Sequence, residues 1–266
     1  MHIPRVRNSQ VRGAFHKLKV VYSQKKIAAK KTIPGMLLLA QSITTPIQAP
    51  VSARIARLKP EIVADVFEQT NPEFLRIRSM IQRVVPEISD EFVEQVIETA
   101  ERVKCEPDDL VALLYKESKL KPTSKNGQFY GLGQMNKKSL KLSINHANTD
   151  ESNQKGIKNI VIERFLKLPR EEQMPYIRNY ILAMKSAYIR NMNKHLSGGE
   201  LYGLFYTPGR INSKFLSSAN DHATAKLYKN NKALDFNKDS KITKQDLQRI
   251  LDNIKAKELN INIAKK

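Results

Sequence analysis

Glu117 is the residue of this 266-residue chain whose setting best suits acid–base chemistry. If a helix runs from about Asp108, Leu113 and Leu114 precede Glu117 by four and three residues, which places all three on one face. A carboxylate on an inward-facing stripe is costly unless it is paired or its pKa is raised. A carboxyl group with a raised pKa can act as a general acid near neutral pH. A glutamate at a frayed helix end, pointing into water, is the alternative.

The segment that follows Glu117 could supply substrate contacts. A glycine-containing loop leads to Gln134, and glycines let backbone and substrate approach closely. The Gln134 amide both donates and accepts hydrogen bonds, which suits an N-acetyl group or a ring hydroxyl, although a turn-stabilising role fits equally. Ser118 has no His base near it in sequence, so we expect a hydrogen-bonding neighbour rather than a nucleophile.

Aromatic side chains near these segments are candidate platforms for a sugar ring. The chain has no Trp, so stacking on a sugar would fall to Tyr or Phe. For each of these residues taken alone, a place in the core is the favoured interpretation. The candidates are Phe129, Tyr130, Tyr202 and Tyr206.

The segment from Glu117 to Met135 resembles the catalytic segment of the lysozyme-like lytic transglycosylases. In that family Glu-Ser is followed by a short loop, a Gly, and then Gly-Leu-x-Gln. This chain has Glu117 and Ser118, then Gly127, then Gly131-Leu-Gly-Gln-Met. The resemblance implies that Glu117 is the single catalytic acid/base and that Ser118, Gln134 and Met135 contact substrate.

Three later segments resemble further parts of the same family, so that the likeness covers about residues 85–250. Residues 165–181 resemble the mid-domain helix with its Gln and Tyr, and 201–210 the helix that closes the sugar groove. Residues 228–247 resemble a tail found on some phage-type members. The resemblance favours Tyr206 and Tyr130 as substrate contacts and implies a mainly α, lysozyme-like domain with a small hairpin or loop near the site.

The resemblance implies cleavage of the MurNAc–GlcNAc bond of peptidoglycan, with the 6-hydroxyl of the muramic acid attacking its own anomeric carbon to give a 1,6-anhydro product. A single acid suits this chain, because no Asp or Glu lies between Ser118 and Thr149. Asp150 and Asp221 remain alternatives as a second carboxylate. A hydrolytic muramidase on the same fold is the enzymatic alternative.

An EF-hand-like loop, DFNKDSKITKQD, occupies residues 235–246. Ser240 replaces the usual Gly, and an Asp replaces the bidentate Glu at the last position. The loop predicts a structural Ca²⁺, and a metal-free loop whose Thr243 caps the last helix is the alternative. The predicted ligands are Asp235, Asn237, Asp239, Lys241, Thr243 and Asp246. No cofactor is needed for the chemistry itself.

The basic charge is concentrated at the N-terminus. The net charge is +20, and residues 1–60 contain twelve Lys or Arg and no acid. Such an arm suits a polyanion or a virion partner, so a basic structural or nucleic-acid-associated virion protein with an inactive domain is the non-enzymatic alternative. Residues 25–53 have the outline of an export signal, but their apolar stretch is too short to span a membrane. The lone Cys105 excludes an internal disulfide.

The chain is therefore expected to have a basic arm (1–60), a lysozyme-like catalytic domain (61–227) and an EF-hand-like segment (228–266). Together with the resemblance, this favours a phage particle-borne enzyme that acts on the host cell wall, with export to the periplasm as the alternative. Apolar spacing and Pro positions predict helices starting at Pro72 and spanning 92–103, 108–118, 157–168, 174–193 and 243–258, a hairpin within 119–135, a polar loop at 145–155 and a break at 197–199.

Overall fold

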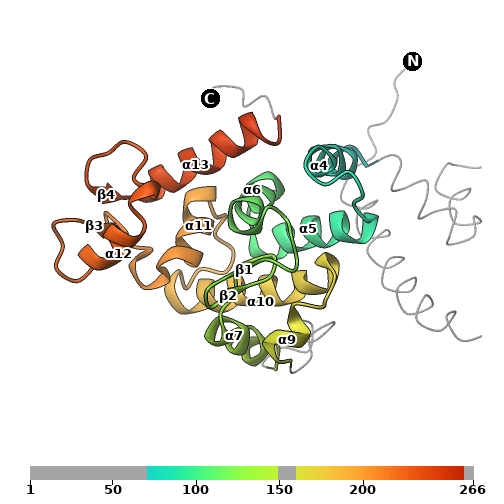
Figure 1. Cartoon of the computed structure of the whole chain (residues 1–266), viewed down its shortest axis with the longest axis horizontal. Coiled ribbons are helices and arrows are strands. Elements are labelled where there is room, and N and C mark those ends of the chain that lie inside the picture. The colour runs from blue at the N-terminus through green and yellow to red at the C-terminus, as the bar shows by residue number, and fades with distance from the viewer. Residues whose placement is uncertain (1–70, 149–159, 261–266) are drawn as a thin grey trace, which may run out of the picture. The chain divides into compact units, whose positions relative to one another are not determined.

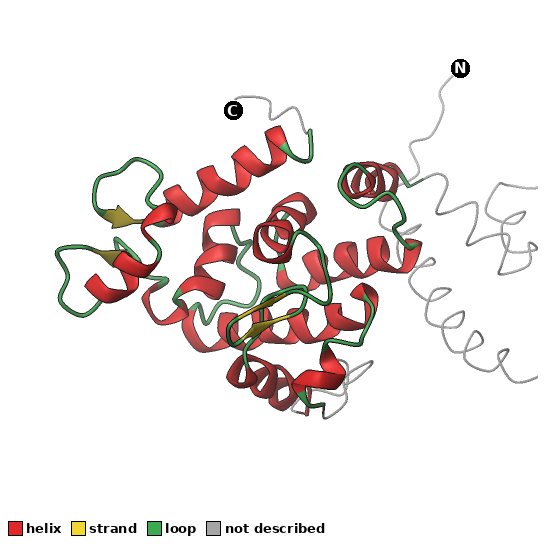
Figure 2. Ribbon diagram, in the orientation of Figure 1, coloured by secondary structure: helices red, strands yellow, loops and turns green. Residues whose placement is uncertain are grey.

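The computed structural model describes residues 71–148 and 160–260, which belong to a unit running from Asn71 to Lys266. The basic arm and the signal-like segment expected from the sequence lie outside the described residues. The described part is mainly helical, as predicted, with two short antiparallel strand pairs (Figure 2). None of its helices combines the length and apolar content needed to cross a membrane.

The first three described helices begin where local sequence signals place them. The Asn71 side chain accepts hydrogen bonds from the backbone N–H groups of Glu73 and Phe74, and Ser89 caps the second helix in the same way. The third helix has Pro107 at its first position, where a missing N–H costs nothing. These helices are α4 (Pro72–Gln82), α5 (Asp90–Val103) and α6 (Pro107–Ser118).

A small hairpin follows α6, as predicted. Strand β1 (Lys125–Asn126) pairs antiparallel with β2 (Phe129–Tyr130), and Tyr130 also bridges to Met135. Helix α7 (Lys137–Asn148) starts directly afterwards. The expected polar loop at 145–155 is therefore wrong over residues 145–148, which are helical; the rest of that segment lies outside the described residues.

The second half of the chain departs from expectation in several places, and one of them is the helix expected at 174–193, which runs instead from Arg170 to Tyr188. Of the helix expected at 157–168, residues 157–159 lie outside the described residues, and within 160–168 only α9 (Ile162–Phe165) is helical, because Val161 is extended and the helix ends ahead of Pro169. The predicted break at 197–199 is instead the start of α11 (Gly198–Tyr206). There Ser197 and Glu200 form a reciprocal capping box, which outweighs the poor helix propensity of two glycines.

The remaining elements carry the chain back across the helices already described. Helix α10 (Arg170–Tyr188) packs on α7 and α5, and the last helix packs on both α11 and α6 (Figure 1). The core between them is apolar and includes Phe92, Leu113, Phe165, Tyr176 and Ile177. The other elements are η1 (Pro208–Arg210), β3 (Ser217–Ser218), α12 (Ala225–Asn230), η2 (Lys232–Leu234), β4 (Lys241–Ile242) and α13 (Lys244–Lys257).

Candidate active site

Glu117 lies in the last turn of α6 at the edge of the buried face of that helix. Leu113 and Leu114, which precede it by four and three residues, are fully buried, while Lys116 beside it is exposed. Glu117 itself is partly buried. This is the position that the helical spacing predicts for a carboxyl group on an inward-facing stripe.

The surroundings of Glu117 favour its protonated form. Burial raises the pKa of the Glu117 carboxyl above its ordinary value and outweighs two effects that lower it: the positive charge of Lys116 and a hydrogen bond from the Tyr202 hydroxyl. Tyr202 is only 5 % exposed, and its own pKa is raised by burial and by the neighbouring carboxylate, so the phenol keeps its proton. The carboxyl group therefore keeps its proton to a higher pH than an exposed glutamate does, and the Tyr202 hydrogen bond offsets part of the cost of its charged form.

The backbone reverses direction immediately after the candidate acid. Lys119 and Leu120 both adopt left-handed conformations, with φ of 55° and 58°. Each costs about 1–2 kcal/mol for a residue with a Cβ. The reversal is held in place because Leu120 is fully buried and its carbonyl accepts a hydrogen bond of 2.7 Å from the Arg170 side chain. Strain of this kind persists where surrounding structure enforces it, and it gathers at functional sites.

One buried side chain, Gln173 of α10, fixes the loop that follows. Its amide oxygen accepts a hydrogen bond of 2.8 Å from the backbone N–H of Leu132. Its amide nitrogen donates to the carbonyls of Pro122 (2.9 Å), Leu168 (3.1 Å) and Phe165 (3.2 Å). Gln173 thus supplies hydrogen-bond partners to backbone groups that have none within a helix or sheet, and it links the loop to α10.

The Gly-Leu-Gly-Gln turn packs closely on α10 and α11. Gly131 has φ of 74°, and a Cβ at that position would lie 2.6 Å from the amide oxygen of Gln173. A Cβ on Gly133 would lie 3.0 Å from Ile177 of α10 and 3.6 Å from Phe205 of α11. Close packing within the protein therefore accounts for Gly131 and leaves little room at Gly133, and the substrate approach that we expected for these glycines stays a prediction.

Gln134 and Met135 are used largely by the protein itself. Gln134 has φ of 46°, and its side-chain amide donates to the carbonyls of Gly131 (2.9 Å) and Ser124 (3.4 Å), which closes the turn. This is the turn-stabilising alternative for Gln134. Met135 is 2 % exposed and its backbone pairs with Tyr130, so its side chain lies in the core.

Ser118 and Tyr130, which were also predicted to contact substrate, lie in different settings. The Ser118 hydroxyl donates to the carbonyl of Leu114 within α6. Tyr130 is partly buried, with the ammonium of Lys125 5.8 Å from its ring, whereas the neighbouring Phe129 is 40 % exposed. These aromatic side chains stand on the hairpin, the part of this segment that reaches solvent.

Tyr206 belongs to the same helix as the partner of Glu117. Four residues separate it from Tyr202, so the two rings lie on one face of α11. Its hydroxyl is 2.7 Å from that of Ser217 in β3. Tyr206 also raises the pKa of Tyr202 electrostatically. The interactions therefore run from Glu117 in α6 to Tyr202 and Tyr206 in α11, and from Tyr206 to Ser217 in β3.

Asp221 is engaged elsewhere and does not act on Glu117. Its carboxylate accepts hydrogen bonds from Thr224, the backbone of Ala223 and Arg210, which keep its pKa below the ordinary value. Asp150, the other alternative as a second carboxylate, lies outside the described residues. The side chains described as shifting the pKa of Glu117 are Lys116 and Tyr202, and neither is a carboxyl group.

The EF-hand-like loop has the expected turn. Ser240, at the position where EF-hands carry Gly, has φ of 68°, and its N–H donates to Asp235 at 2.9 Å. Asp246 accepts from the N–H and hydroxyl of Thr243, so both residues form a capping box for α13. Within residues 71–148 and 160–260, no group of three or more His, Cys, Asp or Glu could hold a metal ion.

The remaining predicted ligands of this loop point to neighbouring backbone. Asn237 accepts from the N–H of Asp239 at 3.1 Å, and Asp239 accepts from the N–H of Lys241 at 2.9 Å. The Asp235 carboxylate likewise accepts from the backbone N–H groups of Asp239 and Ser240 within the loop. The loop keeps its shape through these bonds, and the Ca²⁺ stays a prediction.

Sequence reasoning overlooked the residues that position the acid. Tyr202 was expected only as a sugar platform, yet its hydroxyl binds Glu117. Its spacing of four from Tyr206 was the available signal. Gln173 was noted only as part of a resemblance, and nothing in its local sequence indicates four backbone partners.

Comparison with known proteins adds no relative. No family of known proteins, no curated protein and no solved structure matches this chain.

Proposed function

We propose that this protein is a peptidoglycan lytic transglycosylase that cleaves the MurNAc–GlcNAc bond with Glu117 as its single acid/base. The observation that supports this most is the partly buried Glu117 carboxyl, with its raised pKa and its hydrogen bond from Tyr202. The resemblance of residues 117–135 to the catalytic segment of that family supports the same assignment.

The proposed reaction uses one carboxyl group twice, first as an acid and then as a base. The protonated Glu117 gives its proton to the glycosidic oxygen as the bond from that oxygen to the anomeric carbon breaks. The Glu117 carboxylate then takes the proton of the muramic acid's 6-hydroxyl, whose oxygen forms the new bond to the same carbon. No water is consumed, and the acid is regenerated. The Tyr202 hydrogen bond favours the charged carboxylate between the two transfers.

The decisive experiment compares Glu117→Gln with the unaltered chain in a peptidoglycan zymogram. Gln keeps the size of the side chain and can still accept from Tyr202, but it cannot deliver a proton. General acid–base catalysis is typically worth about 10²–10⁴-fold in rate, so we expect a loss of that size. Unchanged clearing by Glu117→Gln would remove Glu117 from the mechanism.

Product mass separates the two enzymatic schemes. A transglycosylase releases fragments that end in a 1,6-anhydro sugar, which are one water lighter than the reducing ends that a muramidase leaves. We expect the lighter product, because the described residues that act on the Glu117 carboxyl include no carboxylate that could activate water. Reducing ends alone would favour the muramidase.

For the setting, we propose a phage particle that carries the enzyme to the host cell wall. The resemblance of residues 228–247 to the tail of phage-type members supports this, as does a basic arm suited to a polyanionic or virion partner. A salt-dependent DNA-binding assay on the full chain tests the non-enzymatic alternative, because phosphate contacts weaken steeply as salt increases.

We also propose a structural Ca²⁺ in the loop at 235–246. The left-handed Ser240 and its hydrogen bond to Asp235 support it, since the EF-hand needs this sharp turn. If bound, the ion would pin the loop at the start of α13 and take no part in the chemistry. The expected stabilisation by added Ca²⁺ is small, because Asp246 is one methylene shorter than the usual Glu.

A further inference from the structure

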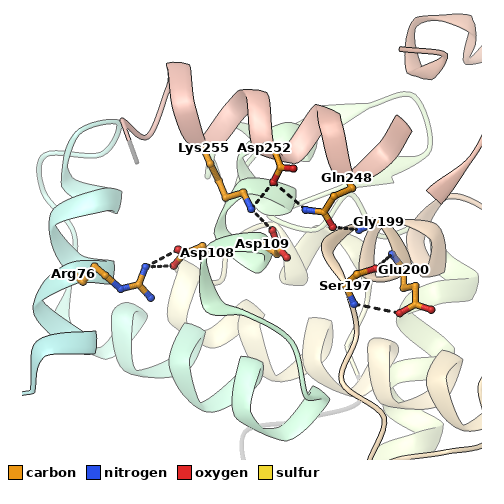
Figure 3. Close-up of polar contacts among 9 residues, drawn as sticks. All are labelled: Arg76, Asp108, Asp109, Ser197, Gly199, Glu200, Gln248, Asp252 and Lys255. Carbon is orange, nitrogen blue, oxygen red and sulfur yellow. Dashed lines mark hydrogen bonds and ion pairs between the residues drawn. The ribbon is translucent and has the colours of Figure 1, made fainter. Parts of the chain in front are cut away.

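Helices α6, α11 and α13 meet at one polar junction near the start of α6 (Figure 3). Lys255 of α13 donates to Asp109 of α6 at 2.6 Å and also pairs with Asp252 at 2.7 Å. Gln248 of α13 accepts from the backbone N–H of Gly199, in the first turn of α11, at 2.9 Å. Helix α13 therefore binds both the helix that carries Glu117 and the helix that carries Tyr202.

Two glycines bring the helices of this junction into close contact. A Cβ on Gly198 would lie 2.7 Å from the carboxyl carbon of Asp109, and a Cβ on Gly199 would lie 2.0 Å from the carbonyl oxygen of Lys244. Real Cβ atoms do not approach that closely. The start of α11 is thus held against α6 on one side and against the backbone of α13 on the other.

The junction lies on the same two helices as the Glu117–Tyr202 pair. Tyr202 is four residues after Gly198, one turn along α11, and Glu117 is eight residues after Asp109 on α6. Helices α6 and α11 are therefore joined at two points, Asp109–Gly198 and Glu117–Tyr202. A shift at the first point changes the geometry at the second.

We propose that Lys255 is a positioning residue for the candidate acid: its ion pair with Asp109 fixes α13 across α6 and α11 and so keeps Tyr202 on Glu117. The inference deepens the proposed function and rests on it for its effect on catalysis. Lys255 contacts neither substrate nor Glu117, and it acts through two helices.

The burial of this ion pair distinguishes it from an ordinary surface contact. The Lys255 and Asp109 side chains are 11 % and 7 % exposed. The adjacent Asp108 pairs with Arg76 of α4 just as closely, but those side chains are 20 % and 46 % exposed. Loss of one partner is costly when the other charge stays buried and costs little at the surface. The Arg76–Asp108 pair is therefore a matched control on the same turn of α6.

The test measures the Glu117 carboxyl directly by ¹³C NMR titration of the full chain, with its signal assigned by its absence in Glu117→Gln. In Lys255→Met we expect the pKa of Glu117 to rise further, because the loosened helices weaken the Tyr202 hydrogen bond that favours the charged carboxylate. In Arg76→Gln the pKa should not change. An unchanged pKa of Glu117 in a folded Lys255→Met overturns the proposal.

Activity measured on the same variants gives a second readout. We expect kcat of Lys255→Met to fall about 10–100-fold with KM little changed, since small displacements of a catalytic group cost rate rather than binding. If Glu117→Gln is as active as the unaltered chain, the proposed function fails, yet the titration still tests the positioning. A higher KM with an unchanged kcat would contradict the role assigned to Lys255.

A second variant keeps the test decisive if Lys255→Met does not fold. Asp109→Asn combined with Lys255→Met removes both charges, which avoids an unpaired buried carboxylate. The double variant lacks the ion pair but retains the Gln248–Gly199 contact. A shifted pKa of Glu117 in this chain supports the proposal, and an unshifted pKa overturns it.

Discussion

Replacing Glu117 by Gln should stabilise this protein near neutral pH. The folded-state pKa of Glu117 lies above its ordinary value of 4.5, chiefly because of burial. Between the two pKa values the folded chain binds more protons than the unfolded chain. The stability that this carboxyl group contributes is therefore present below the unfolded pKa and is lost as pH rises through the folded pKa. The Gln side chain does not titrate, so Glu117→Gln does not lose stability in this way as pH rises.

The size of the effect follows from linkage. Each unit by which the folded pKa exceeds the unfolded one removes about 1.4 kcal/mol of stability at a pH above both. For a unit the size of Asn71–Lys266, 1 kcal/mol corresponds to about 2–4 °C in Tm. The Tm of Glu117→Gln should then exceed that of the unaltered chain by about 3–5 °C per pKa unit at pH 8, with the difference shrinking toward zero at pH 4.

Thermal unfolding followed by circular dichroism between pH 4 and 8 measures this difference. Glu101→Gln, at an exposed position of α5, is the control for loss of one negative charge. The claim that burial destabilises the charged carboxylate would be refuted by either of two results. Glu117→Gln could have a lower Tm than the unaltered chain at pH 8, or the Tm difference between the two chains could be the same at every pH. The pH above which this difference stops growing marks the folded pKa of Glu117.

Three further outcomes are expected. Tyr202→Phe should raise the pKa of Glu117 further, because the phenol's hydrogen bond favours the charged form, and the alkaline limb of the pH–rate profile should move up. Gly131→Ala should destabilise more than Gly127→Ala in urea unfolding: both have positive φ, costing about 1–2 kcal/mol, but only Gly131 meets neighbouring atoms at 2.6 Å. Added Ca²⁺ should raise Tm slightly in the unaltered chain and not in Asp235→Ala, and an equal rise in both would exclude the loop at 235–246.

The sequence predicted features that depend on short-range signals. The helix start at Pro72, the helix over 108–118 and the apolar stripe beneath Glu117 each depend on a few neighbouring residues, and all are present in the structure. The capping box of Ser197 and Glu200 was also local, but two glycines were read as a break, so the start of α11 was missed.

The partners of the candidate acid could not be predicted in the same way. Tyr202 is 85 residues from Glu117 along the chain, and their contact depends on how α6 and α11 pack. The hydrogen bonds of Gln173 depend on where the preceding loop folds, and its sequence neighbours say nothing of that. Periodicity predicts which face of a helix is buried, but not which helix covers it.

The wide separation of Asp109 and Lys255 has a consequence for synthesis. These two residues are 146 positions apart, and a ribosome adds about 5–20 residues per second, so α6 emerges about 7–30 s before the helix that covers it. During that interval the Asp109 carboxylate stays hydrated, and the contacts that α13 makes with α6 and α11 have not yet formed. A nascent chain should therefore complete the junction of α6, α11 and α13 only once α13 has left the ribosomal tunnel.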